Sequence, residues 1–283
     1  MLTVLESIKL SAEYLAKKGI ESPRINAELL LAHILNCKRL DLYLTFDRPL
    51  SDEEIKLYRS FLERRGKCEP LQYIVGSVEF YGLQFKVNSS VLIPRPETEI
   101  LVETIIENYR AKGRVKILDI GTGSGNIAVS LAHNLTDAII TGTDISEEAL
   151  ELARENSLLN NTGEQINFLH NDILINDIGQ KDFDIVVSNP PYVPASEFNG
   201  LRPELRVYEP RQALTDNSDG LNYYRVITAR AGSLLRPGGR LYFEMGKGQE
   251  EEVKKIFKEY NFTSIIIKND YLNIERVISG VIL

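Results

Sequence analysis

The run Asp119-Ile120-Gly121-Thr122-Gly123-Ser124-Gly125 decides which fold class this chain favours. It follows the short apolar stretch Val115–Ile120, which predicts a strand, and it precedes a helical pattern over Asn126–Leu135. Glycines in such a turn let the backbone approach a ligand closely, and the start of a helix offers N–H groups that have no partner within the helix. The spacing is G-x-G-x-G and differs from the G-x-G-x-x-G of dinucleotide-binding proteins. We therefore expect residues 121–125 to form part of a nucleoside-cofactor site.

Acidic residues follow the next two predicted strands. Asp144 comes after Ala138–Thr143, 19 residues beyond Gly125, where a carboxylate can accept from both hydroxyls of a ribose. Asp172 and Ile173 follow the predicted strand Ile166–Leu169, where a carboxylate can accept from an adenine amino group and an apolar side chain can cover the ring. Taken singly, each residue could be only a turn or a cap. Three successive strand ends of this kind favour a ligand site instead.

Strands and helices alternate from about residue 115 to the end of the chain. Such alternation predicts an α/β fold with a mostly parallel sheet and helices on both faces. We expect a turn at Pro237–Gly239 immediately before the strand Arg240–Met245. The other predicted strands are 115–120, 138–143, 166–169, 183–188, 263–268 and 273–282, and the predicted helices are 126–135, one starting at Ser146, 221–235 and 249–260.

The first part of the chain has a helical pattern. Apolar residues recur at helical spacing up to Ile20 and again over Ile25–Leu35, and Ser51 before three acidic residues predicts the start of a third helix that runs to about Arg65. An alternating run over Ser77–Val87 predicts a β-hairpin, and Pro96 suits the first turn of a helix. We predict a helical domain over residues 1–75, a hairpin and linker over 76–95, and an α/β domain over 96–283.

Composition and charge narrow the function classes. The chain has 283 residues, of which 43% are hydrophobic and 26% charged, and its net charge is −7. Residues 1–90 carry 13 basic and 12 acidic residues, a net charge of +1, whereas residues 91–283 carry 20 and 28, a net charge of −8. An acidic protein is a poor candidate for binding duplex DNA. Cys37 and Cys68 have no CxxC partner, so we expect two reduced thiols in a cytoplasmic protein and no metal site.

The predicted strand Phe183–Ser188 runs directly into Asn189-Pro190-Pro191-Tyr192. Adjacent prolines stiffen the backbone and lack N–H donors, and Asn189 supplies a side-chain carbonyl. The Asn189 side chain and the Pro190 carbonyl can therefore accept from a planar –NH2 group, while Tyr192 offers a flat face to pack against it. This arrangement suits a reaction at the nitrogen of an amide or an aromatic amine, where positioning and electrostatics carry the catalysis.

The G-x-G-x-G run resembles motif I of the class I S-adenosylmethionine-dependent methyltransferases, and N-P-P-Y after the fourth strand resembles their amino-methylating members. A nicotinamide dehydrogenase would need the other glycine spacing and a proton-transfer residue that is not evident. These two motifs leave adenine N6, guanine N2 and glutamine N5 open as methyl acceptors.

A wider set of segments resembles the peptide chain release factor glutamine methyltransferases (the HemK/PrmC family). The likeness spans nearly the whole chain, and the segments that carry it are Ala27–Leu31, Glu69–Gly76, Phe80–Gly82, Pro94–Glu99, Asp119–Gly125, Asn189–Tyr192, Tyr208–Arg211 with Ala213-Leu214, and Pro237–Gly239.

This resemblance implies a Rossmann-like class I methyltransferase domain, with a mostly parallel seven-stranded sheet and a terminal antiparallel strand. It implies S-adenosyl-L-methionine as cofactor, S-adenosyl-L-homocysteine as product, and the glutamine of the Gly-Gly-Gln loop of class 1 release factors as substrate. The N-terminal helical domain would help to dock the release factor, Asn189 would contact both cofactor and substrate, and Arg95-Pro96-Glu97 would line the substrate channel. No membrane or stable nucleic-acid partner is expected. The alternatives are a DNA adenine-N6 or ribosomal RNA guanine-N2 methyltransferase and, outside the enzymes, a cofactor-binding adaptor.

Overall fold

The computed structural model describes residues 2–283, which form two compact units. Unit 1 comprises the described residues up to Ser77 together with the short segment Arg202–Tyr208, and unit 2 comprises Val78–Leu201 and Glu209–Leu283. The chain therefore leaves unit 2 after Leu201, adds seven residues to unit 1, and returns to unit 2 at Glu209.

Unit 1 is helical, as predicted. Ser51 caps α3 by accepting from the backbone N–H of Glu54, whose side chain accepts in return from the Ser51 N–H, so the predicted helix start is confirmed. Buried aliphatic side chains from α1, α2 and α3, among them Ile8, Leu30 and Leu62, form one core. The helices are α1 (Val4–Lys17), α2 (Pro23–Ile34), the 3-10 helix η1 (Arg39–Leu44), α3 (Asp52–Arg65) and α4 (Leu71–Val75).

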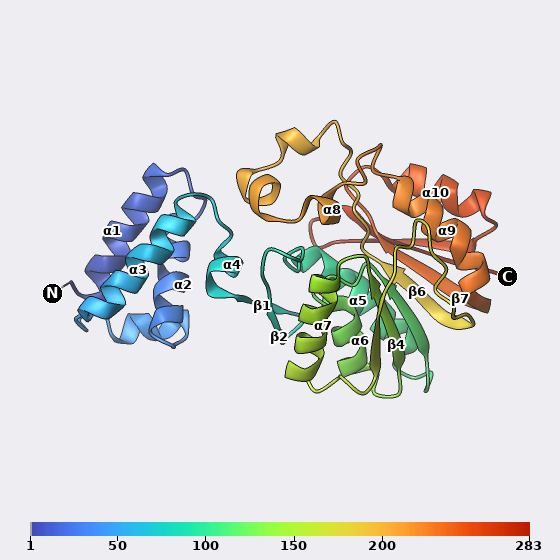
Figure 1. The fold of residues 1–283 in the computed structure, drawn as a ribbon, viewed down its shortest axis with the longest axis horizontal. Helices are drawn as coiled ribbons and strands as arrows, with labels where there is room; N and C mark the ends of the chain where they lie inside the picture. The colour runs from blue at the N-terminus through green and yellow to red at the C-terminus, as the bar shows by residue number, and fades with distance from the viewer. Residues whose placement is uncertain (1) are drawn as a thin grey trace. The chain divides into compact units, whose positions relative to one another are not determined.

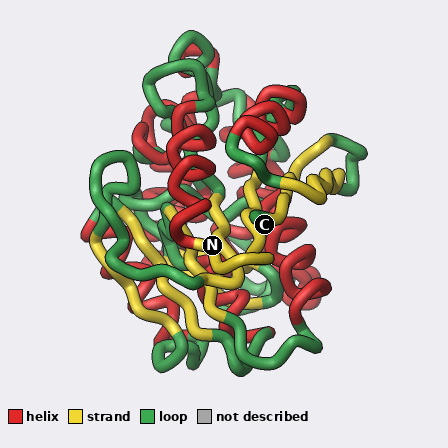
Figure 2. Tube along the Cα trace, turned by 90° about the vertical axis from the view of Figure 1, so that its right-hand side faces the viewer, coloured by secondary structure: helices red, strands yellow, loops and turns green. Residues whose placement is uncertain are grey.

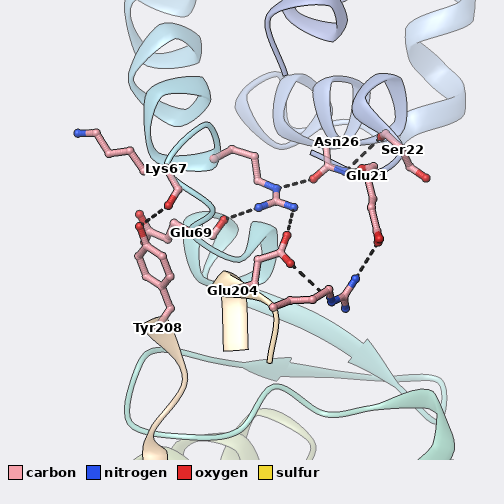
Figure 3. Close-up of polar contacts among 9 residues, drawn as sticks. Glu21, Ser22, Asn26, Lys67, Glu69, Glu204 and Tyr208 are labelled. Carbon is pink, nitrogen blue, oxygen red and sulfur yellow. Dashed lines mark hydrogen bonds and ion pairs between the residues drawn. The ribbon is translucent and has the colours of Figure 1, made fainter. Parts of the chain in front are cut away.

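The segment Arg202–Tyr208 is held to unit 1 by polar contacts (Figure 3). Arg65 has a nearly buried guanidinium that donates to Glu204 Oε1 at 2.6 Å, to Asn26 Oδ1 at 2.7 Å and to the Glu69 carbonyl at 3.0 Å. Two further contacts hold the ends of the segment. Arg202 pairs with Glu21 at 2.7 Å, and the Tyr208 hydroxyl donates to the Lys67 carbonyl at 2.8 Å. The buried guanidinium is thus neutralised by a carboxylate from a distant part of the chain.

Unit 2 begins with the predicted hairpin and continues as an α/β domain whose α5 starts at Pro96, as predicted. Its strands are β1 (Ser77–Phe80), β2 (Leu83–Lys86), β3 (Lys116–Ile120), β4 (Ile139–Asp144), β5 (Ile166–His170), β6 (Phe183–Ser188), β7 (Leu235–Glu244), β8 (Thr263–Asn269) and β9 (Glu275–Val281). Its helices are α5 (Pro96–Tyr109), α6 (Asn126–Asn134), α7 (Glu147–Leu159), the short η2 (Phe198–Gly200), α8 (Arg211–Leu214), α9 (Asn222–Leu234) and α10 (Glu250–Glu259), while η3 (Glu204–Tyr208) belongs to unit 1.

Seven strands form one sheet in the order β5-β4-β3-β6-β7-β9-β8, and in Figure 2 they run side by side in yellow. The pairs from β5 to β7 are parallel, whereas the C-terminal strand β9 pairs antiparallel with both β7 and β8. The predicted mostly parallel sheet with an antiparallel terminal strand is therefore confirmed. Because β3 lies between β4 and β6, the strand order reverses at β3, which is where open α/β sheets bind ligands.

Each face of this sheet has its own core, because successive residues of a strand point to opposite faces. Ile117 and Val187 pack with α5, α6 and α7 on one face, whereas Leu118 and Val186 pack with α9 and α10 on the other. Figure 1 shows these two helix groups on opposite sides of the strands. Both faces are covered, which explains why the central strands are apolar along their whole length.

The prediction that Pro237–Gly239 forms a turn before the strand is wrong. The structure places these residues inside β7, where the pairing with β6 shifts from Phe183 opposite Leu235 to Ile185 opposite Arg240. The extra residues on β7 form a bulge, and Gly238 accommodates it with a φ of +77°. Proline and glycine are common at such bulges, so the local sequence resembles a turn.

Two further features concern the whole described chain. No helix within residues 2–283 is long and apolar enough to cross a membrane. Cys37 and Cys68 are free thiols, both half-buried.

The burial of the Arg65–Glu204 pair makes a prediction about stability. Glu204→Ala leaves a nearly buried guanidinium with only its neutral acceptors, so we expect the free energy of unfolding to fall by about 1–3 kcal/mol. The matched control is Glu21→Ala, which removes the exposed pair with Arg202 and should change it by less than about 0.5 kcal/mol. Urea denaturation of both variants tests this, and equal losses would contradict it.

Candidate functional site

A cavity in unit 2 opens beyond the carboxyl ends of β3, β4, β5 and β6. The predicted site residues that line it are Gly121, Thr122, Gly123, Ser124, Asp144, Asp172, Ile173, Asn189, Pro190 and Pro191. Gly125 and Tyr192 are not among the residues that line it. The structure thus brings ten of the twelve predicted residues to one cavity, although they span 71 residues of sequence.

The glycine-rich loop is held to the end of β4 by its own backbone. The N–H groups of Gly121 and Thr122 both donate to the Thr143 carbonyl, at 2.8 and 2.9 Å, and the Gly123 N–H donates to Asp144 Oδ2 at 2.9 Å. Gly125 serves packing: its φ is +80°, and a Cβ there would lie 3.2 Å from the Cβ of Ala153 in α7. A side chain at this position would push α7 away from the loop.

The two strand-end carboxylates each keep acceptor capacity toward the cavity. Asp144 accepts from the Gly123 N–H on one oxygen and from the Ser146 N–H, at 3.0 Å, on the other. Asp172 accepts from the Leu174 N–H at 2.9 Å. A carboxylate has about four acceptor positions, so these backbone bonds orient both groups without saturating them. Burial raises the pKa of Asp144.

Asp119, at the base of the loop, is fully buried and does not line the cavity. Its Oδ2 accepts from the Thr122 hydroxyl at 2.7 Å, which ties the loop to β3. Among the described residues 2–283, its Oδ1 is one of the few buried side-chain oxygens without a hydrogen-bond partner. Burial, reinforced by the charge of Asp144, raises the pKa of Asp119 to about 7.

Asn189 lines the cavity from the end of β6. The preceding residue, Ser188, is fixed because its hydroxyl donates to the Ile120 carbonyl of β3 at 2.7 Å. The Asn189 Nδ2 donates to the Thr98 hydroxyl at 3.1 Å, which leaves the Asn189 Oδ1 as the acceptor. Pro190 and Pro191 follow in the cavity wall and add no N–H donors.

Tyr192 packs away from the cavity lining. Its ring belongs to the apolar cluster on the α9–α10 face of the sheet, and its carbonyl accepts from Gln249 Nε2 at 3.0 Å. A Cβ on Gly246 would lie 3.0 Å from the ring, so this glycine leaves room for it. Burial raises the pKa of Tyr192. Contact between this ring and a substrate amide stays a prediction.

Sequence reasoning missed the partner of Arg95. The Glu209 carboxylate, which is buried, accepts from Arg95 Nη2 and, at 3.3 Å, from the Ile93 N–H. Arg95 lines the cavity, as expected, together with Pro210, whereas Pro96 and Glu97 of the predicted channel segment do not. The only sequence signal was that Glu209 lies in a segment that carries the family resemblance, because no local pattern joins residues 114 positions apart.

Thr98 and Tyr223 also line the cavity and were not predicted. Thr98 lies in the first turn of α5, and Tyr223 lies at the start of α9. Burial, with the nearby charges of Asp172 and Asp144, raises the pKa of Tyr223, so its ring is a neutral wall on the side of those carboxylates. Thr98 lies in the segment Pro94–Glu99, which carries the family resemblance, but no local pattern singles out either residue, since a threonine or tyrosine near a helix start is common.

Comparison with known proteins agrees with this geometry. Residues 96–203 match the family model described as "Methyltransferase small domain". A crystal structure of a methyltransferase from Pyrococcus furiosus shares the fold, with a TM-score of 0.54 and 19% identity over 71% of this chain and 90% of that one. The fold and the family model define the class: this is an α/β methyltransferase.

The rest of the chain narrows the class to one family. Residues 6–76 match the model described as "PrmC N-terminal domain". The release factor glutamine methyltransferase of Geobacter sulfurreducens is 42% identical over 98% of this chain and 96% of its own. That of Chlorobaculum tepidum is 41% identical over the same shares. This chain belongs to the release factor glutamine methyltransferase family, as its sequence motifs predicted.

The buried carboxyl of Asp119 makes a prediction about pH. Because its pKa rises from 3.8 in an exposed chain to about 7 in the folded protein, the folded state binds that proton more tightly. The resulting stabilisation is complete below the unfolded pKa and is lost as the pH rises through about 7. The wild type and Asp119→Asn are compared by the difference between their free energies of unfolding. This difference, wild type minus variant, should therefore fall from about pH 4 to pH 7 and then level off. Urea denaturation over this range measures it, and a difference independent of pH would contradict the assignment.

Proposed function

We propose that this protein transfers the methyl group of S-adenosyl-L-methionine to the side-chain amide nitrogen N5 of the glutamine in the Gly-Gly-Gln motif of class 1 release factors. The observation that carries the proposal is the position of Asn189 in the same cavity as the glycine-rich loop, with its amide oxygen left as an acceptor. Membership of the family supports the choice of a protein glutamine over other amino groups.

The residues present fit S-adenosyl-L-methionine. The loop 121–125 would hold its methionine portion, Asp144 the ribose hydroxyls, and Asp172 with Ile173 the adenine, since each of these carboxylates keeps unused acceptor positions. The buried Asp119 supports the loop from below. When bound, the cofactor supplies a methyl group on a sulfonium centre, which is open to attack by a weak nucleophile.

The residues of the protein have to orient the amide nitrogen of the substrate glutamine toward the methyl group. A carboxamide nitrogen is a poor nucleophile because its lone pair is delocalised, so the site gains most by orientation. Asn189 Oδ1 and the Pro190 carbonyl accept the two hydrogens of the –NH2 group and direct the nitrogen in line with the methyl carbon. The same acceptors stabilise the positive charge that develops on the nitrogen. No general base is assigned, since the nitrogen is far more acidic once methylated and can lose its proton then.

Unit 1 is proposed to dock the release factor and thereby to present the loop to unit 2. Its near-neutral charge suits a protein partner, and its sequence matches the model described as "PrmC N-terminal domain". Because release factors act on ribosomes, the proposed location is the cytoplasm.

A nucleic-acid amino-methyltransferase is the second candidate, because the Asn189–Tyr192 motif serves either kind of acceptor. The charge of −8 over residues 91–283 disfavours it, since nucleic-acid enzymes need basic surfaces to neutralise phosphates.

A labelling experiment tests the proposed substrate. The protein is incubated with methyl-labelled S-adenosyl-L-methionine and, in separate reactions, a class 1 release factor, its Gln→Ala loop variant, and DNA. We expect label on the first substrate alone. Label on DNA with none on the release factor would overturn the proposal.

Replacement of Asn189 tests the role of the amide acceptor. Asn189→Ala should lower kcat by about 10²–10³-fold, because it removes a preorganised acceptor for the reacting group. Cofactor binding, measured by calorimetry, should be largely retained, because the other proposed cofactor residues, among them Asp144 and Asp172, are unchanged. Full activity of the variant would exclude the proposed role, and retained binding without transfer separates an enzyme from a cofactor-binding adaptor.

A further inference from the structure

Asn189 is one end of a chain of three hydrogen-bonded side chains in unit 2. Its Nδ2 donates to Thr98 Oγ1 at 3.1 Å, and the Thr98 hydroxyl donates to Glu244 Oε2 at 2.6 Å. The three residues come from the end of β6, the first turn of α5 and the end of β7. β6 and β7 are neighbours in the sheet, with Ser188 opposite Phe243, so Asn189 and Glu244 follow paired residues.

The donor and acceptor roles in this series of hydrogen bonds are fixed by the chemistry of the three side chains. A carboxylate only accepts, so the single hydroxyl proton of Thr98 is committed to Glu244. The Thr98 oxygen then has only lone pairs to offer Asn189, and these accept from its –NH2 group. A flipped Asn189 amide would place an oxygen against an oxygen that has no spare proton. Ionised Glu244 therefore determines, through Thr98, which end of the Asn189 amide faces the cavity.

The burial of Thr98 and Glu244 makes their control of the Asn189 amide orientation stronger. Thr98 and Glu244 are each 1% exposed, so water does not compete for their hydrogen bonds. A hydrogen bond to an ionised acceptor in such surroundings is about twice as strong as a neutral one. An uncompensated flip of Asn189 would leave buried polar atoms without partners, which costs free energy.

We propose that Thr98 and Glu244 are positioning residues for the reaction: they hold the Asn189 amide so that its Oδ1, and not its Nδ2, meets the –NH2 group of the substrate. This inference rests on the proposed function, because only a substrate that donates two N–H hydrogens needs an acceptor there. It extends the site to two residues that lie 91 and 55 positions from Asn189 in the sequence.

Glu244 must be ionised for this role, and its surroundings make the charge dependent on pH. Burial raises the pKa of Glu244 to about 7, while the Thr98 hydrogen bond and the Arg276 charge oppose that rise. The Tyr224 hydroxyl donates to the Glu244 backbone carbonyl at 2.9 Å. The other charged or titratable groups that act on Glu244 are Glu97 and Arg95 at the start of α5, and Tyr192 after β6.

Substitution of Thr98 tests the proposal, with a matched threonine on the same helix as control. Thr98→Val keeps the shape but loses both hydrogen bonds, so kcat should fall by about 10–100-fold while the KM for S-adenosyl-L-methionine stays unchanged. Thr98→Ser restores the hydroxyl and should recover most of the loss. Thr104→Val is the control, because Thr104 Oγ1 donates only to the Ile100 carbonyl of α5, at 2.6 Å, and lies outside the cavity.

The Glu244→Gln variant provides a second test, the pH dependence of kcat. A purely structural role of Glu244 would not change this dependence. At low pH Glu244 is protonated, and wild type and variant should have similar kcat values. As the pH rises through about 7, Glu244 ionises in the wild type alone, so the ratio of wild-type to variant kcat should rise to a plateau. A ratio that stays constant with pH would overturn the proposal.

The outcomes separate this inference from the proposed function. If the wild type methylates no release factor, the proposed function fails whatever the variants do. If the wild type is active and Thr98→Val matches Thr104→Val, the positioning role fails while the function stands. If Thr98→Val does not bind cofactor, Thr98→Ser and the pH ratio for Glu244→Gln decide: loss of activity in the serine variant counts against the role, and a rising ratio supports it.

Discussion

The parallel pairing of β3 with both β4 and β6 is the constraint on which the site depends. It reverses the strand order at β3, so the chain that leaves β4 crosses one face of the sheet and the chain that leaves β6 crosses the other. The loops after these strands therefore diverge and leave a crevice at their carboxyl ends. The backbone bonds from Gly121 and Thr122 to Thr143 close the floor of that crevice. The glycine-rich loop and Asn189 line one cavity because they follow the adjacent strands β3 and β6.

Buried polar groups on either side of this crevice compensate one another. Asp119 holds Thr122 on the proposed cofactor side, and Glu244 holds Thr98 on the proposed substrate side. In both pairs a buried carboxyl accepts from a threonine that lines the cavity, and burial raises each carboxyl's pKa to about 7. Perturbed carboxyls of this kind gather at functional sites, because a site must hold polar groups where water is largely excluded.

The segment Arg202–Tyr208 belongs to unit 1, although the chain before and after it belongs to unit 2. It lies downstream of Asn189–Tyr192 and is held to unit 1 through Arg65. The residue that follows it, Glu209, returns to unit 2, where it binds Arg95 in the cavity wall. The chain on both sides of this segment thus contributes to the cavity, while the segment itself packs with the helical unit. The stretch from Asn189 to Pro210 therefore contributes both to the cavity wall and to the packing of unit 1.

The sequence by itself determined most of the helices and strands and the proposed cofactor half of the site. Glycine spacing, the Ser51 cap, Pro96 and the apolar strands act over a few residues, and the loops after parallel strands must meet at one edge. Only the tertiary structure decided the rest. Thr98 meets Glu244 across 146 residues and Arg95 meets Glu209 across 114, and no local pattern encodes such pairs. The bulge at Pro237–Gly239 depends on the register of β7 against β6, and the position of the Tyr192 ring depends on the space that Gly246 leaves. Local sequence specifies conformation, whereas the partner of a buried polar group is decided by which distant segments the fold brings together.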